Sequence, residues 1–98
     1  MNLSQQQRKH LRGLAHALNP VVMVGQHGFS SAVAKELDGA LDAHELVKVS
    51  IRVGDRDLRD QTLAELAQHT NSTMVQRIGN IGVFYRARKD QPRIVLPG

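Results

Sequence analysis

The chain has 98 residues, the size of one ordinary domain, and its hydrophobic share of 41% and charged share of 22% are those of a folded globular protein. Nine of its 13 basic residues are arginine and the formal net charge is +4, which favours an anionic partner without choosing between RNA, DNA and anionic lipid. The absence of cysteine excludes disulfides, thiolate metal sites and cysteine nucleophiles. The polar N-terminal sequence and the lack of a long apolar run lead us to expect a cytoplasmic protein with no membrane partner.

Hydrophobic periodicity and turn residues divide the chain into seven predicted elements. They are a helix over about 3–18, an apolar strand over 21–24 that we expect to be buried on both faces, a helix over about 30–44, an alternating strand over 46–53, a helix over about 57–69, and a hairpin of strands 73–78 and 83–86. The order αβαβαββ predicts a single α/β domain over residues 1–98, with one four-stranded mixed sheet and three helices. We expect a core over about 3–87 and a basic tail over 88–98.

Polar residues and proline mark the helix ends. Ser4 and Gln7 have the spacing of a capping box, in which each side chain satisfies a backbone amide of the other residue. Pro20 ends the first helix, because proline lacks the backbone donor. Ser30 is the expected N-cap of the second helix.

Gly25, Gln26, His27 and Gly28 form a loop between the first strand and the second helix, which we call the GQHG loop. Free amides and the helix dipole favour an anion at such a junction, and glycine allows a sugar-phosphate to approach closely. The spacing resembles the GxxG clamp of KH domains, although tight strand-to-helix turns also need glycine for geometry alone. It lacks the lysine and hydroxyl residues of a nucleotide P-loop.

Basic side chains gather on the first helix and on the alternating strand. Arg8, Lys9 and Arg12 share one helical sector, and this helix ends shortly before the strand that leads to the GQHG loop, so we expect the two to share a surface. Lys48 and Arg52 lie on the polar side of the alternating strand. A solvated charged face is the bland alternative for all of these residues. The predicted RNA-binding set comprises Gly25, Gln26, His27, Gly28, Arg8, Lys9, Arg12, Lys48 and Arg52.

Patterns that carry catalysis are not found. No carboxylate pair, nucleophile–base pair or metal-ligand spacing stands out, so we expect no enzyme activity, metal, cofactor or small-molecule substrate. The few aromatic residues disfavour an aromatic stacking platform. A second glycine pair, Gly79 and Gly82, is attributed to positive backbone angles in the hairpin turn. Two rival functions stay open: a protein-binding module with an exposed strand edge, and a small enzyme that uses His16 and His27 as acid and base.

Four stretches resemble the CRM domain family, named for chloroplast RNA splicing and ribosome maturation, in its stand-alone bacterial YhbY-like form. They read RKHLRGLAH at 8–16, NPVVMVGQHGF at 19–29, HELVKV at 44–49 and GVFYR at 82–86, and the similarity spans about residues 3–90. The resemblance implies a fold like the C-terminal domain of translation initiation factor three, binding to structured RNA, and association with rRNA in precursors of the large ribosomal subunit. It also implies that the GQHG loop contacts RNA, supported by Arg8, Lys9 and Arg12. Gln26 departs from the family pattern, in which a basic residue often follows the first glycine.

Overall fold

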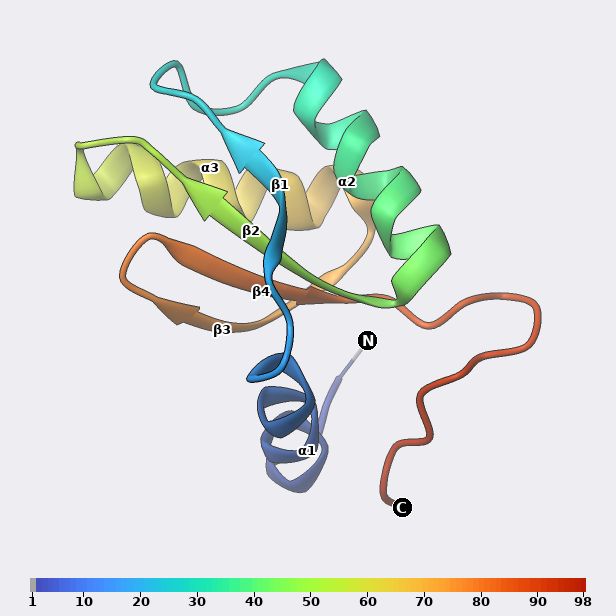
Figure 1. Ribbon diagram of the computed structural model, residues 1–98. Coiled ribbons are helices and arrows are strands. Elements are labelled where there is room, and N and C mark those ends of the chain that lie inside the picture. The colour runs from blue at the N-terminus through green and yellow to red at the C-terminus, as the bar shows by residue number, and fades with distance from the viewer. Residues whose placement is uncertain (1) are drawn as a thin grey trace.

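The computed structural model describes residues 2–98 as a four-stranded sheet with three helices (Figure 1). The elements in chain order are α1 (Gln5–Ala15), β1 (Pro20–Val24), α2 (Ser31–His44), β2 (Leu46–Ile51), α3 (Arg56–Thr70), β3 (Thr73–Ile78) and β4 (Ile81–Tyr85). The strand order is β1-β2-β4-β3, with β1 parallel to β2 and the other pairs antiparallel. The predicted α/β class, mixed sheet and element order are confirmed. Within residues 2–98, none of the helices has the length and apolar character needed to cross a membrane.

The sheet separates two hydrophobic cores. Alternate residues of each strand point to opposite faces, so β2 sends Val47, Val49 and Ile51 to one core and Leu46 to the other. α2 and α3 cover the first face through a set of buried leucines, Leu37, Leu41, Leu63 and Leu66. α1 packs on the second face, where Leu11 and Ala15 meet Leu46, Val75, Val83 and Tyr85. We call this second face, which α1 covers only in part, the open face.

The predicted helix caps form as expected. Ser4 Oγ accepts a hydrogen bond from the Gln7 amide at 3.1 Å, and Gln7 Oε1 accepts one from the Ser4 amide at 3.0 Å. Ser30 caps α2 by accepting from the Val33 amide. α1 ends at Ala15, earlier than predicted, because the amide of Leu18 donates to Ala15 three residues back and tightens the last turn.

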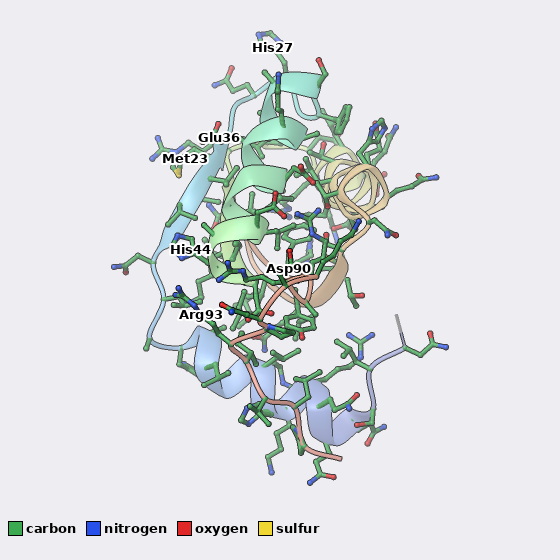
Figure 2. All side chains as sticks on the ribbon, turned by 90° about the vertical axis from the view of Figure 1, so that its right-hand side faces the viewer. Met23, His27, Glu36, His44, Asp90 and Arg93 are labelled. Atoms are coloured by element: carbon green, nitrogen blue, oxygen red, sulfur yellow. The ribbon has the colours of Figure 1, made fainter. Side chains whose placement is uncertain are left out.

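β1 lies at an edge of the sheet and is buried on only one face, so the prediction of burial on both faces is wrong. Val22 and Val24 enter the core under α2, whereas Val21 and Met23 are 54% and 47% exposed. The cause is the placement of α1, which packs on β2, β3 and β4. The outer face of β1 is therefore left open, and Figure 2 shows Met23 extending from it away from α2.

The hairpin and its glycines also differ from expectation. β2 ends at Ile51, two residues before the predicted end, and β4 begins at Ile81, which shortens the turn. Gly79 has φ +57, as a hairpin turn requires. Gly82 lies within β4 without a positive φ, so the predicted reason is wrong for this residue. A Cβ at Gly82 would stand 2.7 Å from Leu63 Cδ2, and close packing against α3 therefore requires glycine there.

The C-terminal residues 87–98, which we call the strap, return along the side of the molecule that carries α1 (Figure 1). Glu45, the C-cap of α2, is 1% exposed and holds the strap. Its Oε2 accepts from the amide of Arg88 at 2.9 Å, and its Oε1 accepts from the amides of Arg93 and Ile94 at 2.7 and 2.9 Å. Gln7 Nε2 then donates to the carbonyl of Pro97, which ties the end of the strap to α1.

Candidate nucleic-acid interface

The GQHG loop projects from the end of the sheet. The amide of Gly28 donates to the Gly25 carbonyl at 3.1 Å and closes a turn whose tip, Gln26 and His27, is exposed. Figure 2 shows His27 at one end of the molecule, pointing away from the helices. Within residues 2–98, the amides of Gln26 and His27 donate to no backbone or side-chain acceptor. Both amides are therefore available to an anion.

The two glycines of this loop have different physical roles. Gly28 has φ +78, and a Cβ there would stand 2.9 Å from Thr62 Oγ1 of α3. Backbone conformation and packing on α3 thus require glycine at this position. Gly25 has no positive φ, and a Cβ there would meet nothing within 4 Å. The fold therefore does not require a glycine at position 25. Because glycine has no side chain, the backbone at this position is open to solvent.

The basic helix does not adjoin the loop, contrary to expectation. α1 and the GQHG loop lie at opposite ends of β1 (Figure 1), a strand of five residues that spans about 15 Å. Arg8 is turned toward β3, where its Nη1 donates to the Met74 carbonyl at 3.2 Å. Lys9 is exposed on α1. The basic residues of α1 and the loop therefore cannot contact the same phosphate.

β2 connects the two regions along the open face. Lys48 lies beside Arg12 and His16 in a groove between α1 and the sheet. Arg52 follows Lys48 by four residues, which corresponds to about 13 Å along a strand. Its amide donates a hydrogen bond to the carbonyl of Val24, the residue that precedes the GQHG loop. Arg52 is exposed, and Val53 beyond it is buried in the opposite core. Arg12, Lys48 and Arg52 thus form a line that leads to the GQHG loop, which we call the cationic track.

Acidic residues are separated from this track. α1 and all four strands contain none, and the nine acidic residues lie on α2, α3, their caps and the strap: Glu36, Asp38, Asp42, Glu45, Asp55, Asp57, Asp60, Glu65 and Asp90. Residues 1–35 carry four basic and no acidic residues, whereas residues 36–98 carry nine of each. The net charge of +4 therefore arises from residues 1–35, whose cations are Arg8, Lys9 and Arg12 of α1 and Lys35 of α2.

Ion pairing strengthens this separation. Arg86 contacts Asp38 at 2.6 Å and Asp42 at 2.8 Å, and Arg77 contacts Asp60 at 2.7 Å. These are the ion pairs found in the described part of the chain, and none of them uses a residue of the cationic track. Arg77 and Arg86 are thus paired with aspartates of α2 and α3, whereas Arg12, Lys48 and Arg52 have no ion-pair partner among residues 2–98.

The histidines give no support to acid–base catalysis. His16 lies in the groove beside α1 and His27 lies at the tip of the GQHG loop, at opposite ends of the cationic track. Among residues 2–98, no three metal-ligating side chains come together as a cation site. Two residues that line the groove, Gln76 and Ile81, were missed, because Gln76 read as an ordinary strand residue and Ile81 was predicted to lie in the hairpin turn. The role of Glu45 was also missed, and its only signal was a charged residue directly before a buried strand.

Comparisons with known proteins agree with the motifs. Residues 3–86 match the CRS1/YhbY (CRM) domain. A Haemophilus influenzae protein named RNA-binding protein is 41% identical over 97% of this chain and 95% of its own length. The Bacillus subtilis protein named Probable RNA-binding protein YqeI is 35% identical over 97% of this chain and 99% of its own length. The solution structure of Staphylococcus aureus SAV1595 matches with a TM-score of 0.84 at 33% identity, covering 98% of this chain and 100% of that one. The chain belongs to the CRS1/YhbY (CRM) domain family.

Proposed function

We propose that this protein binds RNA without catalysing a reaction, and that its target is rRNA in cytoplasmic precursors of the large ribosomal subunit. The relatives named RNA-binding proteins support the first part, and the resemblance of the motifs to the bacterial CRM form supports the ribosomal target. The observation that carries the proposal is an open face on which α1 and the strands contain no acidic residue, and whose cationic track leads to a loop with unused amides.

Each part of the interface has a task in this proposal. The amides of Gln26 and His27 bind one phosphate, and the bare backbone at Gly25 lets the sugar-phosphate chain approach. Lys48 and Arg52 neutralise the following phosphates, as Arg12 does beside α1. Arg8 and Lys9 lie farther from the loop and extend the positive field to RNA that passes over α1.

Lys48→Gln tests the track. Removal of one phosphate-neutralising cation is expected to reduce the slope of log affinity against log salt concentration by about one, and to weaken binding roughly tenfold at low salt. Lys89→Gln is the matched control, because Lys89 lies in a groove with Asp38 and Asp42 on the acidic side. Binding of a labelled rRNA fragment to both variants, at several salt concentrations, measures the difference. If the two variants show the same slope of log affinity against log salt concentration, Lys48 does not contact RNA and the cationic track is not part of the interface.

An exposed strand edge favours a second candidate, a protein partner that adds a strand beside β1. Val21 and Met23 are about half exposed at this edge, an arrangement suited to strand addition. Such binding depends on backbone hydrogen bonds and apolar contact, so its affinity would change little with salt. Strong salt dependence, together with loss of binding after nuclease treatment, distinguishes the RNA partner from the protein partner.

A further inference from the structure

The groove between α1 and the open face has an apolar floor. Ile78, Ile81 and Val83 form it, and Ile78 is 61% exposed. The register places these residues close together, because Ile78 is paired with Ile81 across β3 and β4. Of the three, Ile78 is exposed, Ile81 is partly exposed and Val83 is buried beneath them. Aliphatic surface on a strongly basic face is unexplained by phosphate binding, which needs only charge and backbone amides.

The rim of the same groove carries polar groups at fixed positions. Val83 is paired with Lys48 on one side and with Gln76 on the other, so the two polar side chains flank the floor two strands apart, at about 10 Å. Arg12 of α1 closes a further side. The Gln76 amide offers both a donor and an acceptor, whereas Lys48 and Arg12 offer only donors and positive charge.

A β-bulge brings Gln76 to this position. The register of β3 against β4 shifts between Met74 and Gln76. Met74 packs on the core under α2 and α3, and Val75 packs on the core under α1. Regular alternation would return Gln76 to the face of Met74, but the bulge keeps it on the open face with Val75, in the groove. The irregularity therefore aims one hydrogen-bonding side chain at the groove.

We propose, on the basis of the RNA-binding function above, that this groove receives an unpaired nucleobase and that the target is therefore a single-stranded segment of RNA. The apolar face of the base would pack on the floor of the groove, and its polar edge would form hydrogen bonds with Gln76. The phosphates of the same nucleotide would lie near Arg12 and Lys48. The backbone then follows the cationic track to the GQHG loop. The groove has a volume of about 210 Å³, which is below the range of about 300–1,000 Å³ typical of small-molecule pockets and suits one base of a longer chain.

The charge of the open face and the accessibility of unpaired bases favour a single-stranded RNA base over a polypeptide or duplex RNA. A polypeptide would find an apolar floor here but no carboxylate on α1 or the sheet to pair with its own cations. Duplex RNA hides its base edges in paired stacks, and bases are read mainly in loops, bulges and single strands. Among residues 2–98, no phenylalanine or tyrosine ring is exposed on the open face, since Tyr85 is 2% exposed, so recognition depends on the aliphatic floor, the Gln76 amide and the exposed imidazole of His16 beside them.

Gln76→Ala and Ile78→Ser test the proposal, and Gln61→Ala on the exposed surface of α3 is the control. The probes are labelled single-stranded homopolymers of A, C, G and U and an RNA duplex of equal length. We expect the unaltered protein to bind at least one homopolymer about tenfold more tightly than the duplex. Gln76→Ala should reduce affinity for that homopolymer roughly three- to tenfold and reduce discrimination among bases. The salt slope should stay unchanged, because neither variant removes a cation.

Ile78→Ser keeps the proposal testable if one variant misfolds, because its side chain is already mostly in solvent. One set of results would reject the groove as a base-binding site and leave the proposed RNA binding intact. In that case duplex and homopolymers bind equally and neither groove variant changes affinity, while Lys48→Gln still lowers the salt slope. Failure to bind any of these RNAs or an rRNA fragment would instead overturn the proposed function. Binding of a protein that is lost in both groove variants, with RNA affinity unchanged, would show a polypeptide occupant and reject the nucleobase.

Discussion

Gly28→Ala is expected to destabilise the fold by about 2 kcal/mol or more, whereas Gly25→Ala should change the free energy of unfolding by less than about 0.5 kcal/mol. A side chain at φ +78 costs about 1–2 kcal/mol by itself. At Gly28 it would also meet the Thr62 hydroxyl, which is held by its hydrogen bond to the Leu58 carbonyl at 2.7 Å and cannot move freely. Urea denaturation of both variants measures the difference. Equal losses of stability would show that the two glycines have the same structural role.

The same pair separates binding from folding. The methyl group of Gly25→Ala would occupy the space in which we place the sugar-phosphate chain, so RNA affinity should fall about tenfold while stability is kept. Gly39→Ala is the control, because Gly39 lies on exposed α2 with nothing within 4 Å of its Cβ. That change should stabilise the helix by up to about 1 kcal/mol and leave RNA affinity unchanged. If Gly25→Ala binds as tightly as the unaltered protein, the backbone at position 25 does not contact RNA.

The fold was predictable where the signal is local. Helical periodicity, the capping box at Ser4 and the cap at Ser30 depend on residues within one or two turns, and all of them formed as expected. The alternation in β2 correctly divided Val47 and Lys48 between the two faces of the sheet. These patterns are fixed by backbone geometry, which the sequence expresses over a few residues.

Features set by contacts between distant segments were not predictable. An apolar run such as that of β1 is compatible with burial on both faces or on one, and the placement of α1 decides between them. The bulge that turns Gln76 into the groove leaves no mark in residue types, since Met74, Val75 and Gln76 all suit a regular strand. The assembly of the track was only partly foreseen: Lys48 and Arg12 meet, but Arg8 turns to the Met74 carbonyl.

Glu45→Gln is expected to loosen the strap and lower stability by about 2 kcal/mol. A glutamine oxygen can still accept from Arg93 and Ile94, but its amide group would face the Arg88 amide with donor against donor. Hydrogen bonds to a charged group contribute about 1.5–3 kcal/mol each, and the negative charge is lost as well. Hydrogen exchange at Arg88 and Ile94 should become about tenfold faster or more. Glu36→Gln makes the same chemical change on exposed α2 and should alter neither quantity.

The effect of Glu45→Gln should depend on pH with a definite sign. Burial raises the pKa of the Glu45 carboxyl, but the amides of Arg88, Ile94 and Arg93 and the charge of Arg88 outweigh burial and place the pKa below 4.5. A carboxyl whose folded pKa lies below its unfolded value stabilises the fold fully above the unfolded value, and this contribution is lost as pH falls through the folded pKa. The stability difference between the two proteins should therefore be constant near neutral pH and shrink below about pH 4.5. A difference that grew in acid would contradict a charged, hydrogen-bonded Glu45.

Tyr85 provides an independent measure of the same carboxylate. Burial raises the pKa of Tyr85, and the negative charge of Glu45 raises it further. The chain contains one tyrosine and no tryptophan, so the ultraviolet absorbance of the phenolate reports this residue alone. Glu45→Gln removes one of the two causes, and Tyr85 in the folded variant should ionise at a lower pH than in the unaltered protein. Because Glu36 is not among the causes of this shift, Glu36→Gln should leave the alkaline titration where it is. An unchanged midpoint in Glu45→Gln would mean that the carboxylate is not held beside Tyr85, and the strap would then need another anchor.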